Sequence, residues 1–411
     1  MPVAATKFSN NSKVQLIAAN IADGRVFTRN SVSKMKQSDF EGKKYGKSYK
    51  LYIPGKPKVV NGVVADPSDI VEVETEVFLD NDNVSCTLGP WQRLGDVESF
   101  QDEIAGPWAT SLVRTQEKKI VAKEALKALS AVVTTSPDFI DLGKATAKLR
   151  ALALDSGLVG FLDPETNATI AGASLNKFID QERIKKLYGD VAIGRYGTAD
   201  WVESPDMFEV TVGATAPAVA NSGVITLSAV TKTIGGVSTT VGFETVDTIT
   251  GTNLVKGAMF TVAGLKMVDT SGIQTDVPVQ VIVNEVNAAG TSGTISPLRI
   301  AIDGYVGEVN ANAWVAAGTT TITLVNGLTA GKTYKICEVR SKNCLAYDTY
   351  KFDKLPGSEQ SDVVVGEVAG SAVQMRIFGD GNNLDKLVRV DSAYAASLYE
   401  PREAVVIYVQ Q

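Results

Sequence analysis

The run Asp80-Asn81-Asp82-Asn83 begins as a calcium-binding loop does, with an oxygen-bearing side chain at every second position. Such a loop next needs another oxygen ligand and then a glycine. Val84 and Ser85 stand at those two positions. The run therefore predicts a turn and not a calcium site.

Glu72, Glu74 and Glu76 form a compact set of carboxylates. Two carboxylates perform acid and base chemistry when their environments separate their pKa values. These three glutamates alternate with apolar residues over 71–79, which places them together on the solvated face of a predicted strand. We interpret them as a charged surface and not as a catalytic pair.

Three cysteines, Cys86, Cys337 and Cys344, supply the only thiols of the chain. Three cysteines cannot all form disulfides with one another. The gap between the last two fits neither a C-x-x-C redox motif nor a usual zinc spacing. We interpret all three as small apolar residues.

The chain contains no histidine, which removes the commonest general base, the Ser/His and Cys/His nucleophile systems and a favoured metal ligand. Gly189, Gly194 and Gly197 lack the spacing of a dinucleotide-binding fingerprint, and no Walker-type Gly-Lys-Ser/Thr occurs. A hydrolase would need a histidine-free site, which the residues do not suggest. We predict that the protein is not an enzyme and uses no cofactor and no metal.

The first predicted element is a two-stranded ribbon. Side chains alternate in the manner of strands with one solvated face over 49–53 and again over 71–79. Asn61-Gly62, the favoured type I′ pair, predicts a hairpin tip between them. A ribbon of two strands is marginally stable in water, so this one needs a surface to lie on, and a neighbouring subunit is one candidate.

Helix and strand signals mix in the next part of the chain. Good helix formers with one apolar stripe follow Pro107 and predict the longest helix over 107–133. Further helices are predicted over 142–153 and 174–188, with a buried strand and a turn over 159–164 between them. The fold class predicted from these signals is α+β.

The composition changes between Thr211 and Lys332, where only twelve residues are charged and Gly, Thr, Val and Ala dominate. Strand-like runs recur between turns, with no helical period. We predict an all-β domain over 209–332 that is inserted into the α+β part.

Charge is distributed unevenly near the N-terminus. Residues 1–58 carry twelve Lys and Arg against three acids, a net charge of +9, whereas residues 59–110 carry eleven acids against one Arg, a net charge of −10. The segments could pair between neighbouring subunits or attract nucleic acid, or they could be two solvated faces of opposite sign. The residues expected at inter-subunit contacts are Lys43, Lys44, Lys47, Lys50, Asn61, Gly62, Glu72, Glu74, Glu76, Asp102 and Glu103.

A chain of 411 residues exceeds what one hydrophobic core supports, so we expect several core-bearing units. No apolar run approaches the about 20 residues that span a bilayer, and the first seven residues lack the features of a signal peptide. We expect a protein made in a cytoplasm, without a membrane partner.

A secreted or surface-layer β-rich structural protein is the alternative. The Gly/Thr/Val-rich insert favours it, and the missing signal peptide and the helical N-terminal half oppose it.

Several stretches together resemble one known family. They are residues 49–79, 100–104, 107–109, 133–138, 189–197, 254–265, 387–394 and 400–407, whose order and spacing span nearly the whole chain. In these stretches the chain resembles the coat proteins of short-tailed bacteriophages of the Salmonella type, whose Hong Kong 97-type fold carries an inserted β domain.

The resemblance implies a major capsid protein of a tailed double-stranded DNA bacteriophage. It implies an N-terminal arm over 1–47, an extended β loop over 48–80, a peripheral domain over 81–208 with a spine helix at 107–133, the inserted β domain over 209–332, and an axial domain over 333–411.

The resemblance also implies how the subunits assemble. Hexamers and pentamers of one subunit would form an icosahedral shell in the host bacterial cytoplasm, with a scaffolding protein, a portal and DNA bound without sequence preference. No fused scaffold is expected, because no long helical segment precedes the arm.

Overall fold

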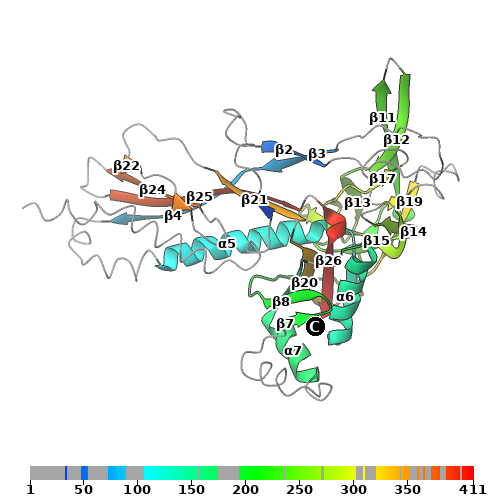
Figure 1. The fold of residues 1–411 in the computed structure, drawn as a ribbon, viewed down its shortest axis with the longest axis horizontal. Helices are drawn as coiled ribbons and strands as arrows, with labels where there is room; N and C mark the ends of the chain where they lie inside the picture. Colours follow the sequence, from blue (N-terminus) through cyan, green and yellow to red (C-terminus); the bar gives the residue numbers. More distant parts are fainter. Residues whose placement is uncertain are drawn as a thin grey trace, which may run out of the picture. The chain divides into compact units, whose positions relative to one another are not determined.

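A computed structural model describes residues 33–34, 48–53, 73–88, 106–154, 157–174, 194–234, 237–269, 273–301, 309–310, 321–342, 344–350, 359–360, 364–365, 372–379, 386–398 and 400–411 (Figure 1). The chain divides into two compact units. Unit 1 comprises Met1–Tyr49, Glu76–Ile120 and Ala346–Ser397, and unit 2 comprises Lys50–Thr75, Val121–Leu345 and Leu398–Gln411. The segments predicted as peripheral and axial domains, 81–208 and 333–411, each contribute residues to both units.

Unit 1 contains a seven-stranded sheet in the order β1-β21-β25-β24-β22, with β4 paired to β25 and β23 paired to β24. Its longest ladder joins β4 to β25 and runs from Asp80 opposite Tyr394 to Leu88 opposite Lys386. The strands are β1 (Ser33–Lys34), β4 (Asp80–Leu88), β21 (Leu345–Tyr350), β22 (Glu359–Gln360), β23 (Val364–Val365), β24 (Ala372–Gly379) and β25 (Lys386–Leu398).

The turn predicted at Asp80-Asn81-Asp82-Asn83 is therefore wrong, because these residues open strand β4. Asn and Asp are rare in strands on average, but here the ladder with β25 supplies hydrogen-bond partners for the backbone groups of these residues. The Asp82 side chain is buried, where it accepts hydrogen bonds from Lys119 and from the Tyr394 hydroxyl. Tertiary partners override the local preference of this run.

The helix α5 (Gly106–Glu124) begins beside Pro107 as predicted but ends earlier than Val133. One 3-10 turn, η4 (Ala125–Lys127), follows it, and β5 (Ala131–Thr134) is a strand, so the predicted helix is wrong beyond η4. The β-branched run at 132–135 fits a strand better than a helix, and β5 pairs in parallel with β26 (Ala404–Gln410).

Unit 2 contains a second seven-stranded sheet in the order β5-β26-β20-β6-β8-β7, with β9 paired to β20. The buried strand predicted at the start of 159–164 is confirmed as β6. The other strands of this sheet are β6 (Leu158–Leu162), β7 (Gly194–Tyr196), β8 (Ala199–Glu203), β9 (Glu209–Thr211) and β20 (Thr333–Ser341).

Two helices accompany this sheet. The first, α6 (Phe139–Ala151), starts a few residues before the predicted 142–153 because Asp138 caps it, accepting the Phe139 N–H at 2.7 Å. The second, α7 (Pro164–Ser174), occupies the place where a turn was predicted, and the helix predicted over 174–188 lies outside the described residues except for its first position. Side chains of α6, α7, β20 and β26 share one buried cluster.

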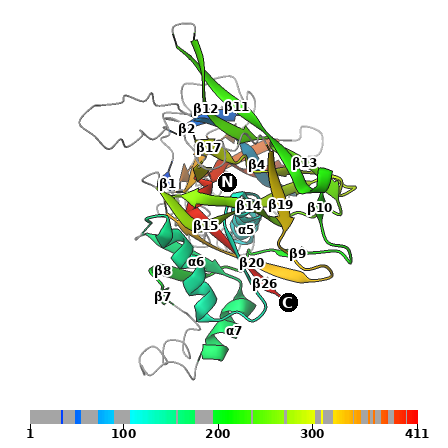
Figure 2. The same ribbon diagram turned by 90° about the vertical axis from the view of Figure 1, so that its right-hand side faces the viewer.

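Ten strands between Ala218 and Asn326 form a third sheet, in the order β10-β13-β16-β15-β14-β18-β17-β12-β11-β19. In both views the β11–β12 hairpin extends beyond its neighbours (Figures 1 and 2). The strands are β10 (Ala218–Val219), β11 (Val224–Ile234), β12 (Val237–Thr245), β13 (Thr248–Thr252), β14 (Met259–Val268), β15 (Gln274–Val286), β16 (Ser292–Ile295), β17 (Arg299–Ala301), β18 (Val309–Asn310) and β19 (Thr321–Asn326).

The core of the ten-stranded sheet also includes residues from outside it. Leu129 and Leu152, which flank α6 in the sequence, are fully buried in the same cluster as Val279, Val281 and Phe260. The described part of 209–332 contains β-strands and one 3-10 turn, η5 (Asn221–Gly223), but no α-helix. The stretch therefore has the predicted secondary structure, and its core continues into the α6 region.

The predicted ribbon is present as a separate two-stranded sheet of β2 (Ser48–Ile53) and β3 (Val73–Phe78). Its predicted tip at Asn61-Gly62 lies outside the described residues. No described helix is long and apolar enough to cross a membrane.

Candidate functional site

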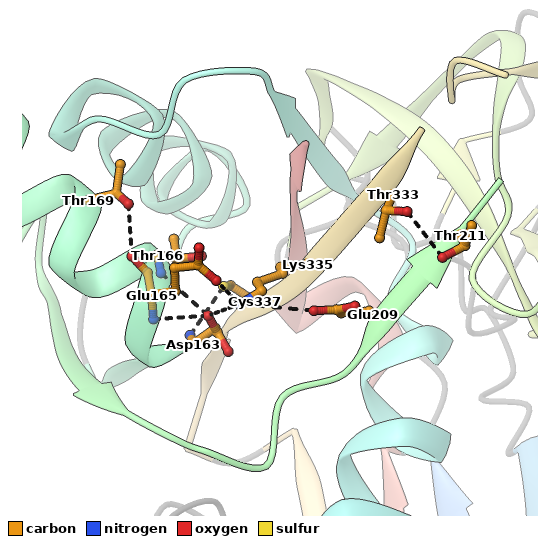
Figure 3. A network of polar contacts seen from close by, with 9 residues as sticks. All are labelled: Asp163, Glu165, Thr166, Thr169, Glu209, Thr211, Thr333, Lys335 and Cys337. Atoms are coloured by element: carbon orange, nitrogen blue, oxygen red, sulfur yellow. Dashed lines mark hydrogen bonds and ion pairs between the residues drawn. The ribbon is translucent and has the colours of Figure 1, made fainter. Parts of the chain in front are cut away.

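The polar network around Lys335 has the residue types that an active site could use (Figure 3). The Lys335 ammonium lies 2.9 Å from Asp163 Oδ2, forms an ion pair with Glu165 and lies 4.0 Å from Glu209 Oε1. Only 12% of the lysine side chain is exposed, against 16% for Asp163 and more than half for the two glutamates.

Three elements bring these side chains together. Asp163 precedes α7 and accepts the N–H groups of Glu165 (3.0 Å) and Thr166 (3.4 Å), which makes it the cap of that helix, and Pro164 suits the first helical position. Lys335 lies on β20, directly opposite Glu209 on β9. The network therefore fastens the start of α7 to the β9–β20 pair.

The β9–β20 pair is the neck through which the chain enters and leaves the ten-stranded sheet. Thr211 and Thr333 lie opposite each other, and their hydroxyls are 3.2 Å apart. Two further backbone hydrogen bonds continue the neck, from Val212 N to Lys332 O at 2.9 Å and from Gly331 N to Gly213 O at 2.8 Å. The ion network lies at the base of this neck.

The electrostatics of the network do not favour catalysis. The hydrogen bond with Glu165 raises the pKa of Lys335, burial opposes this rise, and Asp163 adds to it, with a net raised value. A lysine serves as nucleophile or base when its pKa is depressed. An ammonium held in its charged form by carboxylates acts as a structural cation.

The two described free cysteines are also unreactive. Burial raises the pKa of the Cys337 thiol, which lies beside the network, to about 12, and burial likewise raises the pKa of Cys344. A thiolate is the reactive form, so both are inert at neutral pH. This agrees with their interpretation as small apolar residues; Cys86 lies on β4.

A second ionic pair, Glu338 and Arg340, is fully buried on β20 itself. Arg340 lies 3.4 Å from Glu338 and stacks over the Phe161 ring at 4.9 Å, and each of the two charged side chains is at most 1% exposed. Burial raises the pKa of Glu338, and the nearby Arg340 partly offsets this. No substrate can reach groups that are buried to this degree.

In unit 1, Lys119 of α5 bridges to Asp80 (3.8 Å) and Asp82 of β4. The hydrogen bond with Asp82 raises the pKa of Lys119 despite partial burial. Burial, followed by the two aspartates, raises the pKa of Tyr394. This cluster fixes α5 on the β4–β25 ladder, and among the described residues no group of three His, Cys, Asp or Glu could hold a metal.

The residues predicted for inter-subunit contact fall largely outside the described part of the chain. Lys50 lies on β2, and Glu74 and Glu76 lie on β3, so the structure brings these three to one two-stranded sheet. The others lie outside the described residues: Lys43, Lys44, Lys47, Asn61, Gly62, Glu72, Asp102 and Glu103.

Sequence reasoning missed the network around Lys335. The signal that could have found part of it is Asp163-Pro164-Glu165, which combines a capping residue, a first-turn proline and a first-turn acid. The lysine itself lies far along the chain and has no local signal.

No protein-family model matches the chain, and no curated protein matches it. Among solved structures it is similar to a chain of Mycobacterium phage Che8, with 11% identity, a TM-score of 0.45, and coverage of 92% of this chain and 89% of that one. It is also similar to a chain of the bacteriophage PhiM1 mature capsid, with 8% identity, a TM-score of 0.45 and coverage of 93% and 86%.

A virus-like particle from Pyrococcus furiosus gives 8% identity, a TM-score of 0.41 and coverage of 96% and 98%. With TM-scores below 0.5, these similarities do not by themselves assign a family.

Proposed function

We propose that the chain is a structural protein, the major capsid subunit of a tailed double-stranded DNA bacteriophage. Copies of it form the icosahedral head in the host cytoplasm, as hexamers and pentamers, together with a scaffolding protein and a portal, and enclose DNA bound without sequence preference. The resemblance of its sequence to coat proteins of the Salmonella short-tailed type supports this proposal, including the inserted β domain at 209–332 and the Hong Kong 97-type domain order.

The observation that carries the proposal is the separate sheet of β2 and β3. Each of these strands pairs only with the other among the described strands. Two strands alone are marginal in water. Within the chain β3 buries Val77 but leaves Phe78 57% exposed, so a further partner surface would stabilise the sheet. A second copy of the same chain supplies such a surface in every contact of a closed assembly.

The chemistry of the described polar clusters supports a structural role. The Lys335 network holds a charged lysine between carboxylates, and the Glu338–Arg340 pair is buried beyond reach of a substrate. The two cysteines whose side chains are described, Cys337 and Cys344, have raised pKa values. These groups fix the packing of elements within one subunit, and we propose no catalytic role for the protein.

We propose that inter-subunit contacts use the charged ribbon and its flanks. Lys50, Glu74 and Glu76 of the β2–β3 sheet would meet residues of the +9 and −10 segments of a neighbouring subunit. Repetition of one weak charge contact at every subunit makes it significant for a shell, although each exposed pair contributes only about 0.2–1 kcal/mol.

Negative-stain electron microscopy of the purified chain tests this function. Closed shells or open tubes of regularly arranged subunits are expected when the protein is concentrated. A chain that stays monomeric across concentration and salt series, or forms only flat two-dimensional lattices as a surface-layer protein does, contradicts the proposal.

A further inference from the structure

The edge of the seven-stranded sheet in unit 2 has an unusual set of partners. Among the described strands, β5 is the outermost at one end of this sheet and pairs only with β26. Ser130 O accepts the Val406 N–H at 3.0 Å, so alternate residues of β5 face β26. Ala131 and Val133 therefore direct their backbone groups to the open side of the sheet.

Side chains occupy the open side at Ala131. The Ala131 N–H donates to Oε1 of Gln280 on β15, and the Lys148 ammonium of α6 donates to Ala131 O at 2.6 Å. The Lys148 ammonium also lies 3.5 Å from the same Gln280 Oε1. The backbone N–H of Gln280 donates to Leu129 O at 2.9 Å. Three backbone groups along this edge thus have partners from outside the sheet.

Both side chains of this contact, the Gln280 amide and the Lys148 amine, are buried to an extent that is unfavourable for polar groups. Gln280 is 8% exposed on a strand whose neighbouring residues Val279 and Val281 are fully buried. Burial of the Lys148 amine lowers its pKa to about 8, and the amine donates to two oxygens at the edge, Ala131 O and Gln280 Oε1. A buried amide and a partly buried lysine are costly unless they are hydrogen-bonded, and the β5 edge supplies hydrogen-bond partners to both.

The edge that they cover is prone to pair with other chains. The sequence Ala131-Val132-Val133-Thr134 is uncharged, mostly β-branched and free of proline, and the Val133 side chain is 40% exposed. Open edges of this kind template pairing with further strands, and a lysine or a covering segment is a common protection. Protection matters most for a protein that packs against many copies of itself.

We infer that Gln280 and Lys148 form an edge cap that prevents strand addition by a second copy at β5. This goes beyond the proposed capsid function and does not depend on it, because the cap acts within the single chain. In this inference the ten-stranded sheet also protects the seven-stranded sheet of unit 2, because β15 supplies the Gln280 side chain that hydrogen-bonds to the edge strand β5.

The variant Gln280→Ala tests the cap in the full chain, with Gln274→Ala on the exposed start of the same strand as the matched control. Hydrogen exchange at the Ala131 amide should become at least about tenfold faster only in Gln280→Ala. Under conditions where the wild type stays unassembled, light scattering of Gln280→Ala should rise with concentration, and micrographs should show irregular or fibrous aggregates.

The rescue variant Gln280→Ala/Val133→Pro separates edge pairing from general unfolding. A proline at Val133 removes an N–H that faces the open side and therefore blocks strand addition without restoring the cap. It should return the scattering to the level of Gln274→Ala. Equal aggregation with and without the proline would overturn the inference. The inference would also fail if Gln280→Ala showed fast hydrogen exchange at the Ala131 amide but did not aggregate.

A second route keeps the test decisive if Gln280→Ala does not fold. Lys148→Met removes the amine that donates to Ala131 O and to Gln280 Oε1 but keeps Gln280 itself, and it should aggregate in the same way and be rescued by Val133→Pro. Absence of aggregation in a folded Lys148→Met would contradict the role of the lysine in the cap. Whether the wild type forms shells is recorded separately, so that failure of the capsid proposal and failure of the edge cap give different results.

Discussion

Replacing Lys335 with methionine should destabilise unit 2 far more than replacing a lysine in an exposed ion pair. Lys335→Met keeps most of the apolar stem and removes the ammonium that lies 2.9 Å from Asp163. Asp163 is 16% exposed, so its carboxylate would remain largely buried without a counter-charge. Loss of one partner from a buried pair costs about 3–5 kcal/mol.

Two features of the structure reduce this figure. Asp163 retains the Glu165 and Thr166 N–H groups as hydrogen-bond donors, which still stabilise its charge. Glu165 and Glu209 are 67% and 58% exposed, so water replaces their share of the interaction. We expect a loss of about 2–3 kcal/mol, which for a unit of this size lowers Tm by roughly 4–10 °C.

Lys266→Met is the matched control, because Lys266 also pairs with an aspartate, Asp276, whose side chain is 99% exposed. Differential scanning calorimetry should show a lower Tm for Lys335→Met and almost none of this change for Lys266→Met. A double-mutant cycle with Asp163→Asn adds a direct measure, since the asparagine should cost less in the Lys335→Met background than in the wild type. Equal Tm changes in the two lysine variants, or a cycle without coupling, would refute this account of the network.

Four further predictions concern pH, assembly and the β insert. The pKa of Lys148 in the folded chain, about 8, lies below its usual 10.5, so the unfolded state binds the proton more tightly, and stability should rise as pH increases from about 8 to about 10.5; Tm measured against pH should show this rise in the wild type and not in Lys148→Met. Deletion of residues 61–67 should leave a folded monomer, by circular dichroism, that assembles poorly, and normal shells would count against the ribbon contact. Light-scattering assembly rates of the chain alone should fall from about 0.15 M to about 1 M salt, because the screening length shrinks from about 8 Å to about 3 Å, and a flat profile would exclude charge pairing between subunits. Residues 209–332 expressed alone should give dispersed amide NMR signals but a lower Tm than in the full chain, because Leu129 and Leu152 complete their core, and a collapsed spectrum would show that they do not fold alone.

Elements with strong local signals were predictable from the sequence. The ribbon strands, the start of α5 beside Pro107, most of the helix α6 and the strand β6 follow from periodicity, proline position or local turn and breaker signals. The low charge and recurrent strand signals after Thr211 predicted the all-β composition of the described part of that stretch.

The errors occur where distant residues decide the local structure. Asp80–Asn83 is a strand because β25 supplies a ladder and Lys119 supplies a counter-charge. The helical segment ends at Lys127 because the β-branched residues that follow pair in parallel with β26. Both partners are far away in the sequence, so local propensity could not reveal them.

The network around Lys335 and the edge cap escaped prediction for a related reason. Each joins residues from three elements of which at least one is distant in sequence from the others, and in each the lysine has no recognisable sequence context. The compact units of the chain also combine discontinuous segments, whereas the predicted domains were continuous ranges. Only Asp163-Pro164-Glu165 carried a local signal, which indicated a helix start rather than an ion network.

The two kinds of strand edge in this chain suggest how contacts between copies are directed. The β2–β3 sheet has no described third strand and carries Glu74 and Glu76, whereas the β5 edge has Gln280 and Lys148 placed against it. A chain that assembles with itself must favour one contact and exclude others, because every exposed edge is presented by all copies at once. Loss of the ribbon should therefore abolish assembly without causing aggregation. Loss of the edge cap should cause aggregation while the ribbon contact persists. A single nonspecific surface could not produce these two opposite outcomes.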